Sequence, residues 1–205
     1  MLPVITISRQ FGSGGHEVGE KLARQLDVPF YDKALIAMAA KQSGLSEEVF
    51  AHADEKATSS LLYSMVMGNY SFGARVPSVN EMPINDKLFI IQSDIIKKAA
   101  AEGPCVVIGR CADYILREHA NCLNVFIHAR KEDRIQRTLA KGECEERKAS
   151  DFVTKKDKQR ANYYNFYSNK RWDDLQNYDI TIDSSRFTLD EAVELLMDAA
   201  RKLDQ

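Results

Sequence analysis

A glycine-rich turn between an apolar run and a helical pattern constrains the fold of this chain more than any other feature. The pattern predicts a buried strand over residues 3–8 and a helix over residues 15–27, and four glycines fall within residues 12–19. A strand, a glycine loop and a helix in that order direct backbone N–H groups and the positive end of a helix dipole at one point. We therefore expect a phosphate-binding loop, with a plain strand-to-helix turn as the alternative.

The loop differs from the usual phosphate-binding motif, G-x-x-x-x-G-K-[ST]. Arg9 stands in place of the first glycine, Gly15 in place of the lysine, and His16 in place of the hydroxyl residue. The backbone cradle can survive these changes, but the usual lysine charge is absent. The loop alone therefore leaves open whether it transfers a phosphoryl group or only binds phosphate.

Five short apolar runs alternate with helical patterns, which predicts an α/β fold with a parallel sheet covered on both faces. The predicted strands are residues 3–8, 28–31, 105–110, 122–128 and 178–183. The predicted helices are residues 15–27, 33–43, 86–101, 112–117 and 131–139, most of 141–171, and two that begin near Ser46 and Thr188. In such a sheet a ligand binds at the carboxyl ends of the strands. We treat the 205 residues as one domain.

Composition argues against several classes of function. The net charge of −2 gives no overall attraction to nucleic acid or to an anionic membrane. The four cysteines include no C-x-x-C pair, so neither a zinc site nor a redox motif is indicated. No signal-peptide pattern precedes the first strand, and no apolar run approaches the roughly 20 residues that span a bilayer. We therefore expect a cytoplasmic protein without nucleic-acid or membrane partners.

Charged residues follow two predicted strands, at the edge where a ligand would bind. Arg110 ends the third predicted strand and can hold a phosphate or a carboxylate through two hydrogen bonds. Asp113 could orient Arg110 or bind a base or sugar, and the alternative is a pair with Arg110 that caps the following helix. Asp32 could bind an acceptor or a water on magnesium, or cap the helix that begins at Lys33. We expect Arg110, Asp113 and Asp32 to bind the substrate.

The segment from Arg130 to Arg171 carries 13 Lys or Arg against seven Asp or Glu. We interpret it as a cationic lid that closes over a triphosphate and neutralises charge during transfer. The alternatives are a solvated helical face with ion pairs and a nucleic-acid groove with interleaved tyrosines. The residues expected to bring lid charge to the transferred group are Arg134, Arg137, Lys158 and Arg160.

Residues 63–85 are rich in Tyr, Phe and Met without a clear period. A long irregular apolar stretch of this kind is typical of a lid over a ligand or of a dimer contact. We expect a homo-oligomer, if one forms, to use residues 63–83.

Four motifs occur in order along the chain, ISRQFGSGG (7–15), PFYDK (29–33), VIGRCADYIL (107–116) and DKQRANYY (157–164), followed by NYD (177–179). Together they resemble the cytidylate kinase-like family, a branch of the P-loop nucleoside monophosphate kinases. The resemblance implies a three-layer P-loop NTPase fold with a five-stranded parallel sheet of the adenylate-kinase type. It also implies an NMP-binding insert within residues 33–100 and a lid within 141–171. ATP and Mg²⁺ are the implied cofactors, with CMP or dCMP as acceptor.

The resemblance further implies roles for the glycine loop. Its backbone would cradle the donor phosphates through Gly12, Ser13, Gly14, Gly15 and His16. Because the family's lysine falls at Gly15, we expect Arg9 to supply the missing charge. Because its magnesium-binding hydroxyl falls at His16, we expect Ser13 to bind Mg²⁺. A nucleotide- or phosphometabolite-binding module without transfer activity, and an interaction protein on a kinase fold, are the alternatives.

Overall fold

The structure is a computed structural model that describes residues 1–33 and 84–203. The helices predicted within residues 34–83, and almost all of the aromatic segment 63–85, lie outside the described residues. The expected homo-oligomer contact at 63–83 therefore stays a prediction.

The described residues form one sheet of five parallel strands in the order β2-β3-β1-β4-β5. The strands are β1 (Val4–Arg9), β2 (Phe30–Tyr31), β3 (Val106–Ile108), β4 (Cys122–His128) and β5 (Ile180–Asp183). Strand β1 lies at the centre, where Ile5 is in register with Val106 of β3 and with Leu123 of β4. The predicted five-stranded parallel sheet is confirmed, and the glycine loop therefore leaves the middle of its carboxyl edge.

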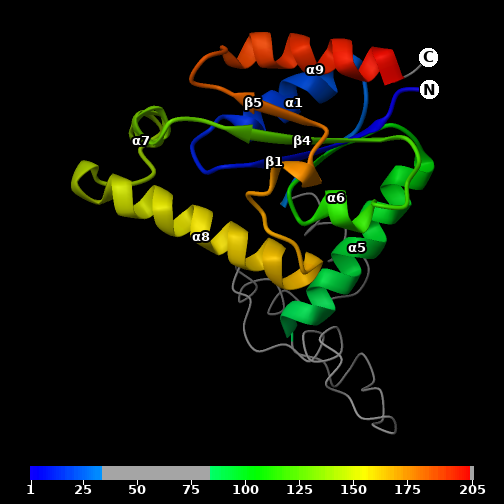
Figure 1. The fold of residues 1–205 in the computed structure, drawn as a ribbon, viewed down its shortest axis with the longest axis horizontal. Coiled ribbons are helices and arrows are strands. Elements are labelled where there is room, and N and C mark those ends of the chain that lie inside the picture. Colours follow the sequence, from blue (N-terminus) through cyan, green and yellow to red (C-terminus); the bar gives the residue numbers. More distant parts are fainter. Residues whose placement is uncertain (34–83, 204–205) are drawn as a thin grey trace, which may run out of the picture.

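Helices cover both faces of this sheet (Figure 1). They are α1 (Gly15–Leu26), α5 (Ile84–Glu102), α6 (Ala112–Ile115), α7 (Lys131–Ala140), α8 (Ala149–Ser168) and α9 (Leu189–Leu203). Figure 1 shows α1 and α9 on one face and α5, α6 and α8 on the other. None of the helices within the described ranges is long and apolar enough to cross a membrane.

The two-sided burial explains why apolar residues predominate on both sides of the strands. On one face Ile5 packs with Leu22 of α1 and Leu196 of α9. On the other face its neighbour Val4 packs with Ile96 of α5. All five side chains are 2% exposed or less, and each contributes about 1.5–3 kcal/mol by leaving water. The core thus fixes β1, and with it the start of the glycine loop.

A third cluster is aromatic and attaches α8 to the sheet. Tyr164, Tyr167, Trp172 and Tyr178 are buried against Phe126 of β4. Within the basic segment, the 20 residues of α8 therefore form a helix that is packed on the sheet. This helix ends where Asn169 adopts a left-handed conformation. This packing places the end of α8 that carries the acidic and basic residues beside the glycine loop.

Candidate active site

The glycine loop adopts a conformation that needs glycine at two positions. Gly12 and Gly14 have φ angles of 75° and 81°, in the left-handed region that other residues rarely adopt. A Cβ atom at Gly12 would lie 2.6 Å from the Arg134 carbonyl oxygen, and one at Gly14 would lie 2.5 Å from a Leu189 methyl carbon. Both backbone shape and space therefore exclude a side chain here.

The loop presents unsatisfied backbone donors at the start of α1. The Val18 N–H makes a hydrogen bond of 3.0 Å to the Gly14 carbonyl, so the N–H groups of Gly15, His16 and Glu17 precede the first helical bond. These groups carry the positive end of the helix dipole, and phosphate is the ligand that suits them. The local geometry fits the phosphates of a nucleotide.

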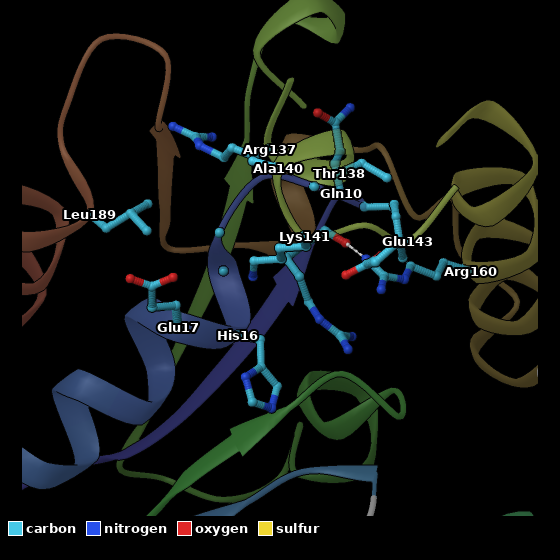
Figure 2. Close-up of a pocket in the computed structure, with 15 residues that line it drawn as sticks. Gln10, His16, Glu17, Arg137, Thr138, Ala140, Lys141, Glu143, Arg160 and Leu189 are labelled. Atoms are coloured by element: carbon cyan, nitrogen blue, oxygen red, sulfur yellow. Dashed lines mark hydrogen bonds between the residues drawn. The ribbon is translucent and has the colours of Figure 1, made fainter. Parts of the chain in front are cut away.

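The loop opens onto a pocket of about 500 Å³ (Figure 2). The residues that line it come from the loop, from α7 and the residues just after it, from α8 and from the start of α9. They include Arg9, Gly12, Gly14, Gly15, His16, Glu17, Arg137, Lys141, Glu143, Arg160 and Leu189. Four of the five predicted cradle residues are in this set. The carboxylates of Glu17 and Glu143 are of the ligand type that Mg²⁺ prefers, and Mg²⁺ commonly takes only one or two of them beside phosphate oxygens.

Ser13 is the predicted loop residue that does not face the pocket. Its side chain is fully buried, and its hydroxyl donates a hydrogen bond of 2.9 Å to the Gln10 carbonyl. Its own carbonyl accepts hydrogen bonds from Ser184 Oγ at 2.6 Å and from Arg137 Nη1 at 3.3 Å. Ser13 thus anchors the loop internally, and its expected role in binding magnesium stays a prediction that this position does not support.

Arg137 and Arg134, both expected to contact the transferred group, donate hydrogen bonds to the loop, and Arg137 also lines the pocket. Arg137 donates to Ser13 and, at 3.0 and 2.6 Å, to the Ser184 hydroxyl and carbonyl. Arg134 is buried, donates to the Phe11 carbonyl at 3.2 Å and forms an ion pair with Asp157. These hydrogen bonds go to carbonyl groups of the loop backbone, and they stabilise its shape.

The Arg9 side chain extends across the loop toward the end of the neighbouring strand β3. A Cβ atom at Gly15 would lie 2.6 Å from the Arg9 Cβ and 3.0 Å from its Cγ, so the arginine stem fills the space above Gly15. The guanidinium reaches Gly109, at the end of β3, where a Cβ would overlap it. Arg9 and Gly15 thus form a packed pair, and the Arg9 side chain lines both the larger pocket and a smaller one at the end of β3.

The His16 side chain contacts Asp32, which follows β2, and so places Asp32 at the same site. Its Nε2 lies 3.1 Å from Asp32 Oδ2, and its ring meets the Phe30 ring edge-on at 5.4 Å. His16 therefore contributes its backbone N–H to the loop while its ring contacts the residue that follows β2. Asp32 therefore lies beside the loop, and its expected role in binding the substrate stays a prediction.

A second, smaller pocket of about 30 Å³ lies between the ends of β1 and β3 and helix α8. Strand β3 is shorter than predicted because Gly109, Arg110 and Cys111 all have left-handed φ angles of 66°, 57° and 55°. This turn places the Arg110 guanidinium 5.6 Å from the centre of the Tyr163 ring. Arg160 lines both pockets, and its Nη1 donates to the Arg9 carbonyl at 3.0 Å (Figure 2).

Two further predicted residues are not at either pocket. Asp113 is 7% exposed and accepts a hydrogen bond of 2.6 Å from Tyr164, so it holds that tyrosine and does not face a substrate. Burial raises the pKa of Asp113, and the Tyr164 hydrogen bond opposes the shift. Lys158 is exposed and lines neither pocket. The roles expected for Asp113 and Lys158 are thus not supported by their positions.

The role of Asp157 and the turn after β3 could not be predicted from local patterns. A helix pattern gives no indication that Asp157 reaches a loop 146 residues away. The three left-handed residues include only one glycine, so the usual indicator of such a conformation is present at Gly109 alone.

The comparisons with known proteins agree with this arrangement. The sequence model of the cytidylate kinase-like family matches residues 4–186, a range that includes every lining residue of the two pockets except Leu189. The chain belongs to the cytidylate kinase-like family. No curated protein gives a significant match.

Solved structures with the same fold include an uncharacterized protein and two kinases of small molecules. An uncharacterized protein from Eubacterium ventriosum has a TM-score of 0.69 and 26% identity, covering 97% of this chain and 98% of that one. A gluconokinase from Sinorhizobium meliloti has a TM-score of 0.55 and 15% identity, covering 98% and 93%. Shikimate kinase from Bacteroides thetaiotaomicron has a TM-score of 0.54 and 14% identity, covering 98% and 99%. The predicted three-layer P-loop kinase fold is therefore confirmed.

Proposed function

We propose that this protein is a kinase that transfers the γ-phosphoryl group of ATP-Mg²⁺ to CMP or dCMP. Family membership and the P-loop kinase fold support a kinase of a nucleotide or another small molecule. The observation that carries the proposal is the glycine loop, whose free N–H groups open onto a pocket of about 500 Å³ next to a second, arginine-lined pocket. In this proposal the partners are nucleotides and the protein works in the cytoplasm.

In this proposal the larger pocket binds the donor nucleotide, and the acceptor binds beside it. The N–H groups of the loop hold the donor phosphates. Glu17 or Glu143 would hold Mg²⁺, which would neutralise charge on the phosphates. Arg110 and Asp32 hold the acceptor, and Arg160 stands between the two pockets. No strong base is needed, because positioning and charge neutralisation dominate phosphoryl transfer.

A phosphoryl-transfer assay with ATP-Mg²⁺ tests the proposal directly. The acceptors would be CMP, dCMP, UMP, AMP and GMP, and we expect turnover with the cytidine nucleotides. Arg110→Ala should raise the acceptor KM at least tenfold, because a charged hydrogen bond to the acceptor is lost. An unchanged KM would remove Arg110 from the acceptor site, and the absence of turnover with every acceptor would overturn the transfer activity.

A binding module without transfer activity is the second candidate. Gly15 favours it, because no lysine stands at the position that normally contacts the β- and γ-phosphates. Such a protein would be stabilised against heat by ATP-Mg²⁺ without turning over any acceptor. An interaction protein on the kinase fold would show neither effect, and its expected contact surface at 63–83 lies outside the described residues.

A further inference from the structure

The last turn of α7 lies against the glycine loop. A Cβ atom at Gly12 would lie 2.6 Å from the Arg134 carbonyl oxygen and 3.0 Å from Thr138 Oγ1. Lys141 follows these two α7 residues by seven and three positions, so it lies on the same face of the helix. Its backbone is still helical at the helix end, with φ and ψ of −85° and −3°. Lys141 is therefore the next residue in the row of α7 side chains that faces the loop.

The turn after α7 brings two charged residues to the larger pocket. The Lys141 N–H donates to the Arg137 carbonyl at 3.2 Å, and the Glu143 N–H donates to the Thr138 carbonyl at 3.3 Å. Gly142 between them has a φ angle of 67°, which lets the chain reverse at this point. Lys141 and Glu143 both line the pocket onto which the loop opens (Figure 2). This hydrogen-bonded turn fixes the backbone from which a cation and a carboxylate reach the pocket.

The positive charge of Lys141 is available to an anion. Within residues 1–33 and 84–203 Lys141 forms no ion pair, whereas Arg147 and Lys148 both pair with Glu145, at 2.8 and 3.1 Å. Lys141 is exposed, so its flexible stem can bring the three N–H donors of its ammonium group to phosphate oxygens. Lys141 thus differs from these two cations of the same segment, whose charge is already balanced.

The other cations that line the larger pocket are engaged by the fold. Arg137 donates to the Ser184 hydroxyl and carbonyl at 3.0 and 2.6 Å. Arg160 donates to the Arg9 carbonyl at 3.0 Å, and the Arg9 guanidinium itself reaches Gly109 at the end of β3. The lysine at the end of α7 is therefore the lining cation that is best able to follow a bound phosphate.

The glycine loop lacks a charge that the donor phosphates normally meet. Gly15 stands where a Walker lysine would contact the β- and γ-phosphates, so the loop offers backbone N–H groups but no full positive charge there. Two carboxylates, those of Glu17 and Glu143, add negative charge to the same pocket. Because like charges repel, a cation beside the donor phosphates would make this pocket a better site for them.

We propose that Lys141 contacts the β- and γ-phosphates of the donor, and so supplies from the end of α7 the charge that the loop lacks at Gly15. This inference rests on the proposed kinase function and makes Lys141 a catalytic residue. In the transfer step an oxygen of the acceptor phosphate attacks the γ-phosphorus. The bond from that phosphorus to the oxygen it shares with the β-phosphate breaks, and ADP leaves with the electron pair. Lys141 keeps its proton and neutralises charge on the leaving group.

Calorimetric titration of the full chain with a non-hydrolysable ATP analogue and with ADP, each with Mg²⁺, tests the contact. Lys141→Met keeps most of the side-chain length and removes the charge. We expect it to bind the analogue at least tenfold more weakly, because a charged hydrogen bond is lost. The loss for ADP should be at least threefold smaller, because ADP has no γ-phosphate. In the CMP phosphorylation assay, Lys141→Met should lower kcat at least tenfold and leave the KM for CMP within threefold.

Two variants control the experiment. Lys148→Met removes the same charge from the segment between α7 and α8, but Lys148 lines neither pocket and pairs with Glu145, so its affinities should stay within twofold. Lys141→Arg keeps a cation at the end of α7, so it should recover the analogue affinity to within threefold. Melting temperatures without nucleotide check that each variant is folded, as we expect for exposed side chains.

The outcomes separate this inference from the proposed function. Analogue affinity within twofold of the unmodified protein in Lys141→Met would overturn the inference, as would an equal loss in Lys148→Met or equal losses for the analogue and ADP. If the affinities change as expected but no acceptor is phosphorylated, the phosphate contact stands and the kinase function fails. If CMP is phosphorylated and Lys141→Met keeps its kcat and its analogue affinity, the kinase stands and the inference fails.

Discussion

Asp157 of α8 accepts a hydrogen bond from the Phe11 N–H at 2.7 Å, so a helix far along the chain holds the glycine loop by its backbone. The second carboxylate oxygen of Asp157 pairs with Arg134, which itself donates to the Phe11 carbonyl. One residue of the loop is thus bound through both of its backbone polar groups. The two charged side chains are 9% and 18% exposed, which makes the arrangement sensitive to loss of either partner.

Asp157→Ala should lower the free energy of unfolding by about 3 kcal/mol, because it leaves Arg134 buried without its counter-charge. It should also weaken ATP-Mg²⁺ binding, because Phe11 and the loop are released. Urea denaturation and a nucleotide titration measure the two effects. Asp151→Ala, an exposed acidic residue on the same helix, is the matched control and should change neither. Unchanged nucleotide affinity in Asp157→Ala would show that the loop keeps its shape without this contact.

Gly15→Lys, which restores the Walker lysine, should destabilise the protein on its own. The new side chain would meet the Arg9 stem, and overpacking of this kind costs about 1–3 kcal/mol. The double variant Arg9→Gly and Gly15→Lys should recover the stability, because the stem is gone. Melting temperatures of the single and double variants form a double-mutant cycle, and we expect a coupling of about 1–3 kcal/mol. Strictly additive effects would contradict the packed pair.

Tyr164→Phe should destabilise the protein by about 1–3 kcal/mol, because it leaves the buried Asp113 carboxylate without the hydrogen bond that Tyr164 donates. Chemical denaturation measures the loss. Tyr163→Phe is the comparison, since the Tyr163 hydroxyl makes a longer and less buried contact of 3.3 Å to Gln92. Equal effects in the two variants would show that the carboxylate does not depend on Tyr164.

Asp113 should give the stability of the protein a defined pH dependence. Burial raises its pKa in the folded state above the ordinary value near 3.8, so the folded state binds the proton more tightly than the unfolded chain. Its contribution to stability is therefore fully present below about 3.8 and is lost as pH rises through the raised pKa. Asp113→Asn should remove this decline. Unfolding measured from pH 3 to pH 8 in both proteins tests it, and parallel curves would contradict the raised pKa.

Much of the fold could be predicted because it follows from local patterns. The runs at Val4–Arg9 and Cys122–His128 are apolar on both faces, as strands in the middle of a parallel sheet require, and both lie where the sequence indicates. The predicted start of a helix near Thr188 is also confirmed, because α9 begins at Leu189 and the Thr188 N–H donates to the Glu191 carboxylate at 2.7 Å. Element ends were less accurate, as at β3, where the left-handed turn cuts the strand short.

The positions of the charged residues could be predicted only in part. Arg110 and Asp32 follow strands, and the carboxyl edge of the sheet brings such residues to the ligand side. Arg134 and Asp113 are turned inward by contacts with residues 23 and 51 positions away, and no local pattern contains that information. The basic composition of the segment was informative, but composition cannot distinguish an arginine that contacts a ligand from one that holds a loop.

The packing of Arg9 on Gly15 also limits the mutational routes open to this sequence. Lysine at position 15 meets the arginine stem as long as Arg9 is present, and loss of Arg9 alone removes a cation from the junction of the two pockets. We therefore expect either single substitution to give a protein that is less stable or less active than the sequence with neither change and the sequence with both. For a sequence with Arg9 and Gly15 to reach the common lysine-containing loop, the two codons would have to change together.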